Sequence, residues 1–288
     1  MLWPKKRPEG TAQAVPDAIT PAELNVRFDE ARFRTHMTTL LEVAQVDGGI
    51  ETYIESLAAK QHLFGTLLGE DVIDDLGEEG IEALLEVVFT ARRKLHPVFA
   101  ELGTGETVAV LRGLLHGRDT LADRMSGFVA ALPIRDAEGR EARGRAARMR
   151  RAAHDFAAEV LHFFDPIRYP LMARWVWDDS TWSGALREFV DNPDQAHRLP
   201  LDTRPETFEA ARAWMAGEIE AQGIYRDVPL WVDLVQAAAY AHYFRSMTGG
   251  VLGSDFSRAG GPEENIKKLL GIEGARRGGK SRVVRSEG

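Results

Sequence analysis

The sequence predicts an all-α protein with roughly ten helices. Apolar residues recur at helical spacing in one segment after another along the 288 residues. No segment shows the sustained two-residue alternation, with β-branched side chains, that marks a strand. Glycine and proline fall between the periodic segments, where helices end. We therefore expect these helices to pack as one large bundle or as two bundles in contact.

The first half of the chain is expected to form three long helices followed by two shorter ones. Thr20, Pro21 and Glu23 combine an N-cap, a first-turn proline and a capping-box acid. This pattern predicts a short helix that begins at these residues, before the first long helix. In the third long helix the basic run 92–94 is expected at the C-terminal end, where cations are favourable, and Pro97 is expected to kink or end the helix. The long helices are expected over residues 29–46, 50–68 and 78–95, and the shorter ones over 104–116 and 120–132.

The middle of the chain is expected to be the centre of the fold. Phe156 and Phe163 belong to an apolar stripe at helical spacing, which predicts a core helix after a polar loop at 134–142. Pro166 ends this helix, and Pro170 gives a second rigid turn. Further helices are expected over 181–190, 206–221, 228–247 and 262–270, with loops at 192–205 and 249–261.

Two packing units are expected along the chain, which can remain separate or merge into one domain. The ends are rich in glycine, charge and, at the N-terminus, proline, which is typical of segments without fixed structure. The expected organisation is a disordered arm at 1–19, an N-terminal helical bundle at 20–133, a C-terminal helical bundle at 143–270 and a basic disordered tail at 271–288.

Composition excludes several classes of function. The chain has no cysteine, which excludes disulfides, thiolate zinc sites, cysteine-ligated iron–sulfur clusters and a cysteine nucleophile within it. The net charge of −8 disfavours broad nonspecific binding to nucleic acid. No apolar run approaches the roughly 20 residues of a membrane span, and no secretory signal follows the basic N-terminus. We expect a cytoplasmic protein without a cofactor and without a membrane partner.

One metal site is suggested by spacing. Glu159 and His162 form a Glu-x-x-His pair, which helical di-iron proteins use twice within a four-helix bundle, and His154 lies on the same helix. Only one copy of the pair is present. The alternative is that these side chains bond neighbouring groups or solvent, since so short a pattern is common.

A basic run near the start of the central helix is a candidate for phosphate contact. Guanidinium groups bind phosphate in a bidentate manner, and Arg143, Arg148, Arg150 and Arg151 are the expected contacts. The alternative is a solvated helix face that pairs with the acidic segment 70–82, within the chain or across a dimer. The full set of arginines is Arg140, Arg143, Arg145, Arg148, Arg150 and Arg151.

An aromatic segment follows the two prolines and suggests a ligand pocket. Trp175 and Trp177 lie close to Arg174 and Tyr169, which together would offer flat faces and a positive charge. The alternative is ordinary core packing, for which such aromatic spacing is also typical.

Residues 162–178, from His162 to Asp178, read HFFDPIRYPLMARWVWD. This segment resembles part of a group of helical bacterial proteins related to the helix-hairpin-helix DNA glycosylases, in which a helix ends at a comparable aromatic and proline corner. The resemblance covers about 20 of the 288 residues. The Leu-Pro-Gly-Val/Ile-Gly hairpin of the glycosylases is absent, as is the lysine or aspartate that follows it, so no catalytic residue is carried over.

Three functions are consistent with these features. Because no strong catalytic motif is present, the first is a non-enzymatic accessory or assembly protein of the bacterial cytoplasm that binds another protein or a second copy of itself. The second is a nucleic-acid-binding protein that uses the arginines of residues 140–151 and the basic tail. The third is a metal-dependent helical enzyme built on Glu159 and His162.

Overall fold

The computed structural model describes residues 19–135, 138–191, 198–248 and 261–272. Within these ranges the chain forms ten α-helices, two 3-10 helices and no strand, which confirms the all-α class. All of the expected N-terminal arm except residue 19, all of the basic tail except residues 271 and 272, and all of the glycine-rich loop except residue 261 lie outside the described residues. In the part of the chain that the structure describes, no helix is long and apolar enough to cross a membrane.

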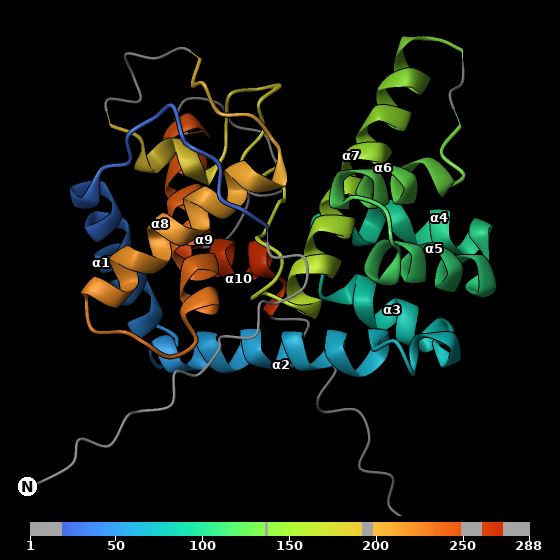
Figure 1. The fold of residues 1–288 in the computed structure, drawn as a ribbon, viewed down its shortest axis with the longest axis horizontal. Helices are drawn as coiled ribbons and strands as arrows, with labels where there is room; N and C mark the ends of the chain where they lie inside the picture. The colour runs from blue at the N-terminus through green and yellow to red at the C-terminus, as the bar shows by residue number, and fades with distance from the viewer. Residues whose placement is uncertain (1–18, 136–137, 192–197, 249–260, 273–288) are drawn as a thin grey trace, which may run out of the picture.

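The helices form two groups that stand on one shared helix, α2 (Ile50–Leu68), which runs along the bottom of Figure 1. One group contains α1 (Glu30–Gln45), α8 (Pro205–Ala221), α9 (Val228–Thr248) and α10 (Pro262–Leu270). The other group contains α3 (Glu78–Glu86), α4 (Arg92–Leu102), α5 (Thr104–His116), α6 (Leu121–Ala131) and α7 (Arg140–Phe164).

The groups do not follow the order of the chain. α1 packs against α8, α9 and α10, whereas α7 packs against α2, α4, α5 and α6. The expected division into bundles at 20–133 and 143–270 therefore runs across this packing. The buried apolar residues of both groups form one continuous core, because α2 contacts both α7 and α9.

The third long helix expected at 78–95 is broken. α3 ends at Glu86 and α4 begins at Arg92, and residues 87–91 between them form a partly buried turn. This turn packs against the end of α10, where Gly271 has a left-handed backbone (φ +66°) and a Cβ would collide with the carbonyl of Val87. Pro97 lies inside α4 and does not end it. Local sequence gives no sign of this break, because residues 87–91 contain neither glycine nor proline.

Two short expected helices also differ. Residues 20–23 are not helical, because the Ala22 N–H donates to the Glu206 carbonyl (2.9 Å) and this segment lies along α8. Farther on, Phe28 makes an antiparallel bridge with Val190. The helix expected at 181–190 is the 3-10 helix η2 (Ala185–Phe189). The remaining helices lie where the sequence predicts them, within about three residues.

Candidate functional site

A buried ion pair lies at the centre of the fold. The Lys60 ammonium of α2 donates to the Glu159 carboxylate of α7 (2.7 Å) and to the Leu270 carbonyl (2.7 Å). It also sits 3.8 Å from the centroid of the Phe163 ring. Burial lowers the pKa of Lys60 and raises the pKa of Glu159, and attraction between the two groups opposes both shifts. Glu159 therefore serves to hold Lys60 inside the core.

His162 is held by two acceptors one turn farther along α7. Its Nδ1 lies 2.8 Å from the Tyr169 carbonyl, and its Nε2 lies 2.8 Å from the Asp233 carboxylate of α9. Both ring nitrogens therefore lie at hydrogen-bond distance from an oxygen atom. The Asp233 bond ties α7 to α9, and the Tyr169 bond fixes the corner after α7.

The metal site expected at Glu159, His162 and His154 is not assembled. Glu159 binds Lys60, and His162 binds Asp233 and Tyr169. His154 lines a separate pocket. Among the residues that the structure describes, these three side chains do not converge on a common point. The helical Glu-x-x-His pair here has partners from other helices, as the alternative reading of the sequence expects.

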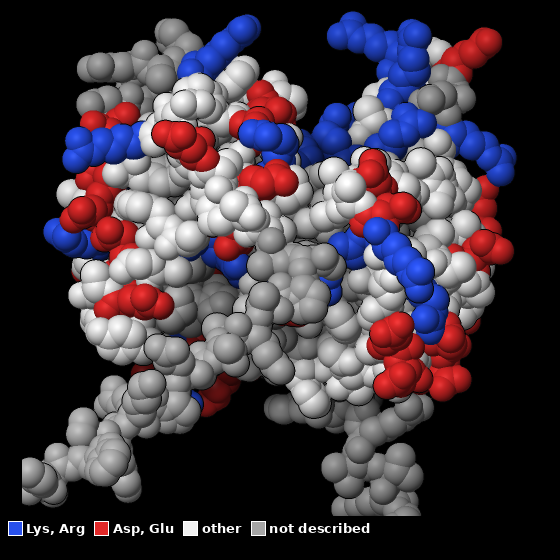
Figure 2. Space-filling model, in the orientation of Figure 1, with Lys and Arg blue, Asp and Glu red and all other residues white. Residues whose placement is uncertain are grey.

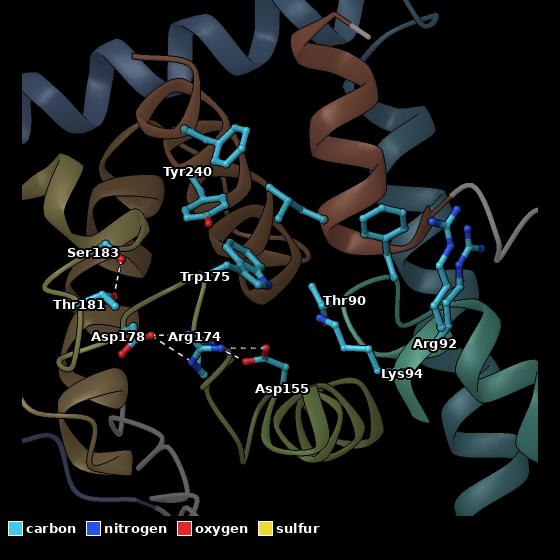
Figure 3. A pocket seen from close by; sticks show the side chains of 14 residues that line it. Thr90, Arg92, Lys94, Asp155, Arg174, Trp175, Asp178, Thr181, Ser183 and Tyr240 are labelled. Atoms are coloured by element: carbon cyan, nitrogen blue, oxygen red, sulfur yellow. Dashed lines mark hydrogen bonds and ion pairs between the residues drawn. The ribbon is translucent and has the colours of Figure 1, made fainter. Parts of the chain in front are cut away.

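A pocket of about 550 Å³ is the best candidate for a functional site, because charged, aromatic and hydroxyl side chains line it together. Figure 3 shows α4, α7, α9 and the segment after Arg174 contributing its walls. Four cationic and two acidic side chains line it: Arg92, Arg93, Lys94, Arg174, Asp155 and Asp178. The aromatic walls are Phe89, Trp175, Tyr240 and Phe244, and hydroxyl groups come from Thr90, Thr181 and Ser183.

The basic residues 92–94 occupy the first turn of α4 and not the last turn of α3. The N-cap residue Ala91 gives no side-chain capping bond. The N-terminus of a helix carries a partial positive charge, so three cations there repel it and each costs roughly 0.3–1 kcal/mol. The positive potential of the helix end and of Arg92, Arg93 and Lys94 is therefore concentrated beside the pocket. This arrangement lowers the stability of the folded chain and favours the binding of an anion beside the first turn of α4.

Trp175 supplies an unused hydrogen-bond donor in the same pocket. Its side chain is buried, with 5% exposure, and the indole Nε1 has no partner within the described structure. Figure 3 shows the ring nitrogen pointing into the space in front of Thr90 and Lys94. A buried donor without a partner costs about 1–3 kcal/mol, which an acceptor on a ligand would recover.

Arg174 links two carboxylates with different proton affinities. Its guanidinium lies 2.6 Å from Asp178 and 3.9 Å from Asp155, and its backbone N–H donates to Asp155 (2.9 Å). Burial raises the pKa of Asp155 to about 6, against the opposing effect of Arg174. Burial acts in the same direction on Asp178, but hydrogen bonds from Ser180 and Arg174 outweigh it and hold the Asp178 pKa below its usual range.

A second pocket of about 540 Å³ lies on the other side of this ion pair. Arg174 and Asp178 line both pockets, and Arg150, Arg151 and His154 line the second. Burial, followed by the charge of Arg174, lowers the pKa of His154. Its Nδ1 is buried and has no partner within the described structure. The second pocket thus holds a histidine that stays neutral near pH 7, next to two arginines.

The aromatic residues expected to form one pocket are divided. Arg174 and Trp175 line the first pocket, while Trp177 lines the second and donates its Nε1–H to the Leu201 carbonyl (3.2 Å). Tyr169 lies in neither of these two pockets; its ring packs under the guanidinium groups of Arg124 and Arg168.

The sequence did not reveal the residues of α4, α7 and α9 that complete the first pocket. The basic run 92–94 was visible, but it was assigned to the wrong helix end. Asp155 and Tyr240 follow helical periodicity and carry no signal that distinguishes them from ordinary helix residues. Only the tertiary structure brings them to the same cavity.

The arginines at the start of α7 lie on a helix that projects beyond its neighbours (Figure 1). Figure 2 shows them as a basic region at the upper right, apart from the acidic region at the lower right. In the described structure the acidic segment pairs with other residues: Asp74 with Arg112 (2.7 Å) and Glu82 with His96 (3.7 Å). The pairing of residues 140–151 with residues 70–82, within the chain or across a dimer, stays a prediction.

Comparisons with known proteins leave the site to be interpreted from its own geometry. The resemblance of residues 162–178 to relatives of the helix-hairpin-helix glycosylases stays a prediction. No protein-family model, no curated protein and no solved structure matches this chain.

Proposed function

We propose that this protein binds a small ligand of the nucleotide class, with a phosphate group and a flat ring, in the pocket of Figure 3. The observation that carries the proposal is the unpartnered, buried indole N–H of Trp175, which faces the basic first turn of α4. The donor and the cations favour the same kind of ligand group, an anionic oxygen acceptor.

The charge of the pocket favours phosphate. Arg92, Arg93 and Lys94 offer several N–H donors, and Arg side chains can bind two phosphate oxygens at once. Asp155 and Asp178 are partly neutralised by Arg174 between them, so the positive charge at the α4 side dominates.

The aromatic side chains favour a flat ring on the ligand. The rings of Trp175 and Tyr240 lie 5.9 Å apart, and that of Phe244 follows at 6.3 Å from Tyr240. Aromatic faces stack on planar groups, with ring centroids at about 4.5–7 Å. The cavity of about 550 Å³ is within the usual range of small-ligand pockets.

The direct test is a calorimetric titration of the full chain with AMP, ADP, pyrophosphate and adenosine. AMP or ADP should bind, and adenosine should bind at least about tenfold more weakly because it lacks the anionic group. Trp175→Phe removes the N–H and keeps a flat ring, and Arg93→Gln with Lys94→Gln removes two cations. Each variant should weaken binding of the phosphate-bearing ligands about tenfold or more.

Arg118→Gln is the matched control, because Arg118 is an exposed arginine that does not line the pocket. It should bind like the unchanged protein. The proposal is contradicted if no phosphate-bearing compound binds, or if binding is the same in the Trp175 and Arg93/Lys94 variants as in the unchanged chain.

A second function, nucleic-acid binding, is supported by a different observation. Arg140, Arg143, Arg145, Arg148 and Arg151 are all exposed on the projecting half of α7. Such a surface would contact phosphates without reading bases, and affinity would fall steeply as salt rises.

Fluorescence anisotropy with labelled duplex DNA at several salt concentrations tests this second function. Arg143→Gln with Arg148→Gln should reduce the slope of log K against log salt by about 0.9 for each lost phosphate contact. The matched control is Arg34→Gln, which changes an exposed arginine on α1 that pairs with Glu30. A salt-independent signal, or an unchanged slope in the double variant, would exclude this surface.

The expectation of a non-enzymatic accessory protein that binds another protein stays a prediction. The exposed large apolar side chains include Val46 at the end of α1, Ile167 after α7, Tyr225 before α9 and Met247 within α9. They come from separate elements, and so they add less support to a protein interface than the pocket adds to ligand binding.

A further inference from the structure

We propose that His36, Glu188 and His242 form a binding site for one divalent transition-metal ion. This site is separate from the pocket of Figure 3 and does not depend on the nucleotide proposal. Its three side chains come from three elements: α1, η2 and α9.

The ligand atoms already have the spacing that a metal requires. Glu188 Oε2 lies 3.5 Å from His36 Nε2 and 3.0 Å from His242 Nδ1, and all three atoms lie within 4.8 Å of one another. Around a tetrahedral ion with bonds of about 2.0–2.1 Å, ligand atoms are separated by roughly 3.3 Å. An ion can therefore be accommodated by small side-chain movements.

The surrounding structure holds two of the three ligands in place. The side chains of His36 and Glu188 are 7% and 11% exposed. The His36 ring packs edge-on against Phe189 (5.4 Å between centroids), and the Glu188 carbonyl accepts from the Arg32 side chain (2.7 Å). α9 packs against both α1 and η2. Because these contacts already restrict His36 and Glu188, less conformational entropy is lost when the two side chains bind the ion.

The donor set selects the class of ion. Two imidazole nitrogens and one carboxylate oxygen suit zinc, cobalt, nickel or ferrous iron, whereas calcium and magnesium prefer oxygen ligands alone. Three protein ligands leave at least one coordination position for water. The His242 side chain is 61% exposed and lines a cavity of about 390 Å³ together with Arg245 and Ser246, so the open position has access to solvent.

The test uses the full chain after treatment with a chelator. Cobalt(II) is titrated while its visible absorption is followed, and zinc binding is measured by calorimetry. One ion per chain should bind, with nitrogen and oxygen ligands visible in the cobalt spectrum. His242→Gln changes an exposed side chain and should fold normally, yet it should weaken binding at least about tenfold. Glu188→Gln should do the same while keeping the shape of the side chain.

His96→Gln is the matched control, because His96 forms an exposed pair with Glu82 (3.7 Å) that is open to adventitious ions. It should leave the affinity unchanged. Absence of stoichiometric binding in the unchanged chain would overturn the proposal. So would full binding in both His242→Gln and Glu188→Gln, or loss of binding in His96→Gln alone, since each result would place the ion elsewhere.

Discussion

At the scale of single residues, the most informative side chains are buried polar groups with unusual partners. Lys60 and Glu159 form an ion pair with side-chain exposures of 0% and 1%. Trp175 has a buried donor without a partner in the described structure. None of this follows from the sequence, because helical periodicity treats Lys60 and Glu159 as polar residues of an outer face. The two side chains are buried because α2, α7 and the end of α10 pack together around them.

The buried ion pair predicts an asymmetric response to mutation. Glu159→Gln leaves Lys60 without a countercharge in the core and should lower the free energy of unfolding by about 3–5 kcal/mol. Lys60→Met combined with Glu159→Leu removes both charges and should recover most of that loss. Urea denaturation of the two variants measures the difference. A double variant no more stable than Glu159→Gln would contradict this interpretation of the pair.

Asp155 predicts a pH dependence of stability. Its pKa rises from 3.8 to about 6 on folding because the carboxyl is buried, so the folded state favours the protonated form. The stabilisation of the folded state by protonated Asp155 is therefore present at low pH and is lost as pH rises through about 6. Asp155→Asn should be more stable than the unchanged chain above pH 6, by about 2–3 kcal/mol.

The pH window gives the check on Asp155. The stability difference between the variant and the unchanged chain should vanish near pH 4 and grow up to pH 6. Urea denaturation at a series of pH values measures it. A difference that stays constant between pH 4 and pH 7 would show that Asp155 has an ordinary pKa in the folded protein.

At the scale of elements, long amphipathic helices were predictable and their interruptions were not. α2 and α5 have the bounds that local periodicity and glycine boundaries predict. The break between α3 and α4 is not marked by glycine or proline, and its first residue, Val87, lies against the backbone of Gly271. Because α4 begins at Arg92, residues 92–94 lie in its first turn and form the basic rim of the pocket. A helix boundary here determines where charge is presented.

Gly271→Ala tests this contact between elements. The left-handed backbone costs a residue with a Cβ about 1–2 kcal/mol, and the collision with Val87 adds to that cost. The variant should be less stable by at least that amount. Gly65→Ala is the matched control: Gly65 lies within α2 with open space around it, and alanine there should stabilise by up to about 1 kcal/mol. Equal effects of the two changes on urea denaturation would exclude the Gly271 contact as a determinant.

At the scale of the whole molecule, composition concealed the arrangement of charge. The net charge of −8 is an average over a surface that, at the right of Figure 2, carries a basic region above and an acidic region below. The sequence did indicate uneven charge, and five of the six arginines of residues 140–151 are exposed on the projecting half of α7. It could not indicate that α1 joins α8 to α10, or that residues from α4, α7 and α9 meet at one pocket. Those features depend on which apolar faces match in three dimensions.

The central claim is that Trp175 donates to a phosphate-bearing ligand, and the indole N–H signals of the isotopically labelled protein test it most directly. The chain has six tryptophans, and the signal missing from Trp175→Phe identifies the relevant one. On addition of AMP that signal should shift strongly, while adenosine at the same concentration should leave it in place. Binding of AMP that leaves the Trp175 signal unchanged, or no response to either compound, would contradict the claim.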